Sequence, residues 1–154
     1  MTMKNITRFN IRIYGILVNE YSQVLVSDEL IKGQKYTKFP GGGLEFGEGT
    51  RACLIREFKE ETGVLIEIKE HLYTTDMFIP SFFDDDSQVI CIYYLVKCND
   101  WSKIRTSSVK FDFVNENSES FRWVKVDEVK NEDYLLLPTD RAVVQIIGAF
   151  KSFL

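Results

Sequence analysis

The chain has 154 residues, a formal net charge of −4 and a sequence pI near 5.1. Hydrophobic residues make up 45% and charged residues 27%, which is typical of a soluble globular protein, and the length suits a single domain over residues 1–154. The acidic balance and the lack of a basic stripe argue against nucleic-acid binding through phosphate contacts.

Cysteine usage and the N-terminal residues bear on location. The three cysteines form no CxxC pair, and their odd number indicates neither a disulfide framework nor a zinc site. Such usage favours a reducing cytoplasm. Residues 1–15 lack the apolar core and cleavage site of a signal peptide, and no apolar run approaches the roughly 18 residues of a membrane span. We therefore expect a cytoplasmic protein that does not bind a membrane.

Strand-forming residues dominate the chain up to Phe39, where Ile, Val, Phe and Tyr recur between short polar breaks. Gly33 falls within a polar stretch and is typical of a loop. This pattern predicts strands over residues 7–19, 23–28 and 36–39, a turn at 19–22 and a loop over 29–37.

A proline–glycine loop at Pro40–Gly43 leads to a helix that is predicted over residues 51–62. Thr50 is suited to the N-cap of this helix, and Gly63 to the position just beyond its C-terminal end. Apolar side chains that recur at helical spacing predict the side that faces the core: Ala52, Ile55 and Phe58.

The second half of the chain centres on an almost continuous apolar run at residues 88–97. Such a run predicts a strand buried on both sheet faces, so helices should cover both faces. A helical apolar stripe, with Thr139 as N-cap, predicts a helix over residues 140–152. Shorter patterns predict strands at 64–69, 72–79 and 120–125 and a helical turn at 126–130. This order of elements suits one mixed sheet.

Three carboxylates share one face of the first predicted helix. Glu60 lies about 60° from Glu57 around the helix axis, and Glu61 about 40° on its other side. Like charges at this spacing repel, so they need a positive neighbour. Arg56 offers one explanation, a solvated ion-paired face. A divalent metal offers another, because carboxylates and the carbonyls of loop 40–43 suit Mg²⁺ or Mn²⁺.

The same stretch resembles the Nudix box, the signature motif of the Nudix hydrolase family, and matches it at every fixed position. The matching residues are Gly42, Glu48, Arg56, Glu57, Phe58, Glu60, Glu61, Gly63 and Val64. The resemblance implies an α/β fold of the Nudix type, an α/β/α sandwich with a mixed central sheet and helices on both faces.

The resemblance also implies a pyrophosphohydrolase that depends on Mg²⁺ or Mn²⁺ and cleaves the diphosphate linkage of a nucleoside diphosphate joined to another group. The substrate classes in question are nucleoside triphosphates, nucleotide sugars and ADP-ribose, and a homodimer is expected on the same ground alone. The alternative is a catalytically silent nucleotide-binding sensor with a Nudix fold. The intact set of box glutamates argues against this alternative.

By resemblance, most of the metal ligands come from the box. The implied ligands are the Gly41 carbonyl, Glu57, Glu60 and Glu61, with Glu48 in reach of the same metal or its waters. Arg56 is implied to orient a box glutamate, and the alternative is an ordinary surface ion pair worth about 0–1 kcal/mol.

The general base and the base-stacking residues stay open. Glu57 is one candidate for the base, and outside the box Glu116 is preferred over Glu119, although both could be exposed loop acids. Three aromatic residues could stack on a nucleobase or belong to the core or rim: Phe78, Phe82 and Phe83.

Overall fold

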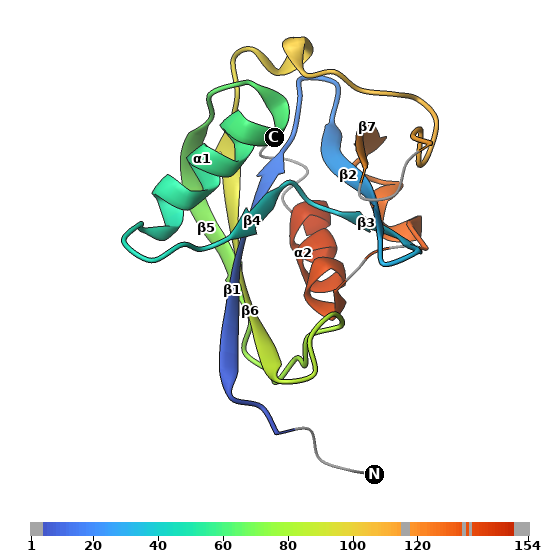
Figure 1. Cartoon of the computed structure of the whole chain (residues 1–154). Helices are drawn as coiled ribbons and strands as arrows, with labels where there is room; N and C mark the ends of the chain where they lie inside the picture. The colour runs from blue at the N-terminus through green and yellow to red at the C-terminus, as the bar shows by residue number, and fades with distance from the viewer. Residues whose placement is uncertain (1–4, 115–117, 134, 136, 150–154) are drawn as a thin grey trace.

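The computed structural model describes residues 5–114, 118–133, 135 and 137–149. Helices α1 and α2 lie on opposite sides of the long strands β1 and β6 (Figure 1). The elements in chain order are β1 (Arg8–Leu17), β2 (Gln23–Ile31), β3 (Gln34–Lys38), β4 (Gly41–Gly43), α1 (Thr50–Thr62), β5 (Glu67–Thr74), β6 (Ser87–Lys97), the 3₁₀ turn η1 (Trp101–Lys103), β7 (Glu119–Lys125), the 3₁₀ turn η2 (Val129–Asn131) and α2 (Pro138–Ala149). Neither helix is long and apolar enough to cross a membrane, judged over these residues.

The strands form two sheets. The larger sheet has the order β4-β1-β6-β5, with β1 parallel to β6 and both edge strands antiparallel to their neighbours. The smaller sheet, β3-β2-β7, is antiparallel throughout. The mixed central sheet and the α/β class are thus as predicted, but a second sheet is present where the sequence suggested only one.

Each face of the larger sheet packs against its own helix, because side chains alternate along β1. Ile13 and Leu17 belong to the core that contains residues of α1, whereas Tyr14 and Ile16 belong to the core that contains residues of α2. The helical residues in these two cores are Cys53, Leu54 and Phe58 on one side and Val143, Val144 and Ile147 on the other. The apolar run at 88–97 is therefore covered on both faces, as expected.

Helix α1 ends as predicted but begins differently. Gly63 adopts a left-handed conformation with φ of 78° and stops the helix. Gly49 is the N-cap, so the prediction of Thr50 is wrong. Thr50 lies inside the first turn instead, where its hydroxyl is 2.7 Å from the hydroxyl of Tyr94.

The core-facing side of α1 is rotated from the predicted one. Ala52 is exposed, while Leu54 and Phe58 are fully buried. A Cβ atom on Gly15 would lie 2.6 Å from Phe58, so the glycine of β1 leaves room for that ring. Helix α1 therefore faces β1 with Phe58 and Leu54, which fill the space left by the missing side chain of Gly15. The periodicity of the helix sequence alone does not predict this rotation.

The loop predicted over residues 29–37 is wrong. Strand β2 continues to Ile31 and pairs with β3 through a tight hairpin. Lys32 and Gly33 both have positive φ, 49° and 77°, as a type I′ turn requires. The prediction failed because residues 29–37 are mostly polar and lack the alternation of apolar and polar residues that indicates a strand.

Two later boundaries also differ. The strand predicted at 72–79 is wrong, because β5 runs without a break from Glu67 to Thr74. Helix α2 starts at Pro138, so Thr139 is in its first turn and is not the N-cap. A proline fits the first helical position, since its missing N–H would have no partner there.

Candidate functional site

The glycine strand β4 brings the backbone close to both β1 and α1. A Cβ atom on Gly41 would overlap the carbonyl oxygen of Ile13. A Cβ atom on Gly42 would overlap the carboxylate of Glu57. Only glycine fits both positions, so the loop predicted to approach a ligand places its backbone directly against one acidic side chain of the helix.

Arg56 connects the acidic residues of the loop and the helix. Its guanidinium forms two hydrogen bonds to Glu48, from Nη2 at 2.7 Å and from Nε at 3.0 Å. Nη1 donates to Glu57 at 3.0 Å and to Glu60 at 3.2 Å. Nη2 also donates to the Gly43 carbonyl at 3.2 Å. These contacts exceed a single surface ion pair and tie the glycine strand, the connecting loop and α1 together.

The acidic side chains differ in exposure and in electrostatic state. The side chains of Glu48 and Glu57 are 15% exposed, whereas that of Glu60 is 59% exposed. The Arg56 hydrogen bonds lower the pKa of Glu48 to about 2. Burial raises the pKa of Glu61 to about 8, and its Oε2 is buried without a hydrogen-bond partner in the described part of the chain. Glu61 is thus the acid that most lacks a positive partner.

The carboxylate oxygens of the box suit a hard divalent cation, although they do not surround a single point. Among the described residues, no three His, Cys, Asp or Glu side chains are arranged to hold a metal ion. Glu57 and Glu60 both accept from Nη1 of Arg56 instead. Carboxylate oxygens are the ligands that Mg²⁺ and Mn²⁺ prefer, and the unpartnered oxygen of Glu61 would gain most from a cation. The metal-binding roles stay predictions.

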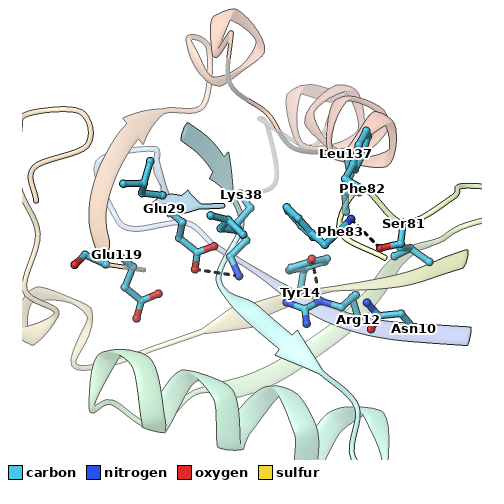
Figure 2. Close-up of a pocket in the computed structure, with 14 residues that line it drawn as sticks. Asn10, Arg12, Tyr14, Glu29, Lys38, Ser81, Phe82, Phe83, Glu119 and Leu137 are labelled. Atoms are coloured by element: carbon cyan, nitrogen blue, oxygen red, sulfur yellow. Dashed lines mark hydrogen bonds and ion pairs between the residues drawn. The ribbon is translucent and has the colours of Figure 1, made fainter. Parts of the chain in front are cut away.

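The first cavity, of about 410 Å³, lies between β1, the β2–β3 hairpin and the loop at 81–83. Figure 2 shows Arg12 and Tyr14 beside each other on β1, with Glu29, Lys38 and Glu119 toward one end of the cavity. The lining residues are Asn10, Arg12, Tyr14, Glu29, Leu30, Ile31, Lys38, Ser81, Phe82, Phe83, Val89, Ser118, Glu119 and Leu137. Its size and mixed lining suit a small organic ligand.

A second cavity, of about 800 Å³, adjoins the C-terminal end of α1 and is lined by Glu61, residues 104–107 and 112–114 and the start of β7. Glu119 lines both cavities. Burial is the largest cause that raises the pKa of Glu119, and the negative charge of the neighbouring Glu29 is the second. Of the two predicted acids outside the box, Glu119 therefore lies near Glu61, while Glu116 falls outside the described residues.

The structure brings two of the three predicted aromatic residues to the first cavity. Phe82 and Phe83 line it, whereas Phe78 is 61% exposed and does not. Phe83 is held from the hairpin, because Lys32 Nζ donates to its carbonyl at 2.7 Å and the ring of Tyr36 meets its ring edge-on at 5.7 Å. The stacking role stays a prediction for Phe82 and Phe83.

Three further lining residues were missed from the sequence: Arg12, Tyr14 and Lys38. Arg12 Nε donates a long hydrogen bond of 3.4 Å to the Tyr14 hydroxyl. Lys38 is buried and pairs with Glu29 at 3.2 Å. A signal was available for the first of them, because Asn10 and Arg12 are polar residues at alternate positions of an otherwise apolar strand and must share one face.

Comparisons with known proteins bear on the family and the fold of the chain. A family model described as NUDIX domain matches residues 8–145. Nucleoside triphosphatase NudI of Klebsiella pneumoniae is 30% identical over 104 residues, which cover 62% of this chain and 69% of that protein. The 8-oxo-dGTP diphosphatase of Haemophilus influenzae is 32% identical over 119 residues, 72% of each chain. A NUDIX hydrolase structure from Nitrosomonas europaea shares the fold, with a TM-score of 0.69 and 16% identity over 94% of this chain and 91% of that one.

Proposed function

The chain belongs to the Nudix hydrolase family, enzymes that act on phosphoric anhydride bonds, and we propose that it cleaves the diphosphate linkage of a nucleoside diphosphate joined to another group. The observation that carries this proposal is the set of carboxylates that Arg56 holds against the glycine strand. Both curated relatives described above are named for nucleoside triphosphates, so that class is the first to test, followed by nucleotide sugars and ADP-ribose.

The proposed cofactor is Mg²⁺ or Mn²⁺, held by Glu57, Glu60, Glu61 and the Gly41 carbonyl, with Glu48 in support. When bound, such a cation neutralises the diphosphate and helps to activate the attacking water. The unpartnered oxygen of Glu61 and the contact between Glu57 and the glycine strand support this assignment. Cytoplasmic location and a homodimer remain predictions.

The side chains have separable tasks in this proposal. Arg56 positions Glu48 and Glu57, because it donates to both at 3.0 Å or less. The first cavity receives a part of the substrate outside the cleaved diphosphate, with the ring of Phe83 on its wall. Glu119 lines both cavities, and we assign it the role of accepting a proton from the attacking water, with Glu57 as the other described candidate for the base.

A substrate panel tests the proposal directly. It contains nucleoside triphosphates, nucleotide sugars, ADP-ribose, dinucleoside polyphosphates and NADH, each with Mg²⁺, with Mn²⁺ and with EDTA. We expect turnover that EDTA abolishes, with products that identify the cleaved bond. Tight nucleotide binding without any product would instead support the sensor alternative.

The variant Glu57→Gln tests the role of the box. It removes the charge of a proposed ligand at constant size, so we expect kcat to fall by more than about 100-fold while Tm in EDTA stays close to that of the parent protein. Glu67→Gln is the matched control, because Glu67 is an exposed acid on β5. Equal rates for the two variants would contradict the metal assignment.

A further inference from the structure

The first cavity contains two cationic side chains on the same aromatic ring. The guanidinium carbon of Arg12 lies 5.9 Å from the ring centre of Tyr14, and Lys38 Nζ lies 6.0 Å from it. Both residues line the cavity, and Figure 2 shows both close to Tyr14. A neutral ligand would not require two cations at this place.

Lys38 already has an acidic partner, but Arg12 does not. Lys38 Nζ is 3.2 Å from Glu29, and the side chains of this pair are 7% and 14% exposed. Arg12 forms no ion pair with any described residue, and its one side-chain hydrogen bond is the 3.4 Å contact with Tyr14. An arginine has five N–H donors, so most of the donors of Arg12 have no acceptor among the described residues.

The cavity around Arg12 is partly apolar, which makes an unpaired charge costly. Phe83, Val89 and Leu137 contribute to its wall. Charged groups enclosed in this way are usually paired and hydrogen-bonded, and guanidinium binds carboxylate and phosphate oxygens in a bidentate manner. The missing partner of Arg12 should therefore be an anion on the ligand.

Arg12 reaches the cavity from the face of β1 that is turned away from the core of α1. Arg12 and Tyr14 project from the face of β1 opposite to Ile13, which packs in the core of α1. In the β1–β4 pair Arg12 is opposite Gly43, whereas Ile13 is opposite Gly42, the residue that contacts Glu57. The anion at Arg12 thus lies on the cavity side of the glycine strand.

We propose that the first cavity recognises an anionic substituent, a phosphate monoester or a carboxylate, carried by the part of the substrate outside the cleaved diphosphate. Arg12 is the principal partner of this substituent and Lys38 the second. This inference rests on the proposed function and narrows it to diphosphates that bear an additional acidic group.

Matched substrate pairs test the proposal. CoA and dephospho-CoA, and NADPH and NADH, differ by one phosphate monoester, whereas UDP-glucuronate and UDP-glucose differ by one carboxylate. We expect kcat/KM for the anionic member of at least one pair to exceed that of its partner by about 10-fold or more, as one charge-assisted hydrogen-bonded contact allows. Which pair shows the preference identifies the anion as phosphate or carboxylate.

Variants locate the preference. Arg12→Met should bring the kcat/KM ratio of that pair close to one, and Arg12→Lys should retain part of the preference because it keeps the charge. Arg51→Met removes the same charge from an exposed site on α1 and should leave the ratio unchanged. A ratio that Arg12→Met leaves unchanged, or that Arg51→Met lowers equally, would overturn the assignment.

Anion binding, measured as a rise in Tm, tests the role of Arg12 independently of the proposed hydrolase activity. In EDTA the acidic residues of the box repel anions, so inorganic phosphate or acetate should raise Tm only through Arg12 and Lys38, and not in Arg12→Met. Turnover without any preference between pair members would refute the inference alone. An anion-dependent rise in Tm without turnover of any diphosphate would refute the proposed function alone.

Discussion

Two glutamates at the ends of the acidic cluster show how strongly a residue's surroundings determine its state. Glu48 accepts two hydrogen bonds from Arg56, which lower its pKa to about 2 and keep it ionised. Burial raises the pKa of Glu61 to about 8, so it binds a proton at neutral pH until a cation replaces that proton. Identical side chains within one motif therefore differ in charge state before any cation binds.

Replacement of Gly42 by alanine should impair activity more than stability. The new Cβ would overlap the Glu57 carboxylate, which must move away from the glycine strand and from Arg56. We expect kcat to fall by about 10–100-fold, the range seen when the support of a metal ligand is lost. The control is Gly43→Ala, whose Cβ would meet only the end of the Arg12 side chain, at 3.4 Å. Steady-state kinetics that rank the two variants equally would argue against this role of Gly42.

The sequence predicts the box cluster and not the cavity residues for a physical reason. Glu57, Glu60 and Arg56 lie within one helical turn or so, and helix geometry alone brings them together. Arg12 and Lys38 belong to strands in different sheets, and only tertiary packing places both beside Tyr14. The local sequence pattern contains no information on contacts between residues of different sheets.

At the scale of secondary structure, α2 depends on a buried acid. Asp140, in the first turn, accepts a hydrogen bond from the Leu137 N–H at 3.0 Å and another from the Tyr93 hydroxyl at 2.5 Å. The first contact caps the helix and the second joins it to β6. The sequence predicts a helix start at residue 140 because Thr139 suits an N-cap, whereas the contact between Asp140 and the Leu137 N–H caps the helix before Pro138.

Asp140 should make stability depend on pH. Burial raises its pKa from 3.8 to about 6, so between about pH 4 and 6 the folded state binds more protons than the unfolded state. The free energy of unfolding should therefore decrease by up to about 3 kcal/mol as the pH rises through this window. Urea unfolding at pH 4, 5, 6 and 7 measures it. Asp140→Asn should remove the part of this slope that Asp140 contributes and leave the part that the raised pKa of Glu61 contributes, whereas Asp133→Asn, at an exposed position, should keep the full slope.

On the scale of the whole molecule, the smaller sheet is held by a buried ionic network. Arg122 of β7 donates to Asp28 of β2 at 2.5 and 2.9 Å and to Glu132, beyond η2, at 3.3 Å. Asp28 also accepts from the Thr37 hydroxyl of β3 at 2.8 Å. The second sheet escaped prediction because it is built from contacts of this kind between residues far apart in the chain.

Arg122→Met should destabilise the protein strongly. The substitution leaves Asp28, which is fully buried, without its cation, and the loss of one partner of a buried pair costs about 3–5 kcal/mol. Arg8→Met is the comparison, since the Arg8–Asp86 pair is exposed and such pairs contribute about 0–1 kcal/mol. Denaturant unfolding at pH 7 gives both values, and similar losses for the two variants would contradict the assigned importance of the network.

The central sheet separates the core that contains residues of α1 from the core that supports the apolar wall of the cavity. Residues of α1 pack in one core, while Tyr14, Val89 and Leu137 of the cavity pack in the other. Mutations that reshape the cavity therefore alter contacts with α2 and leave the packing of α1 intact. Over evolutionary time, descendants of such a chain can exchange one ligand for another without rebuilding the acidic helix, and an engineer can randomise the apolar cavity positions on the same ground.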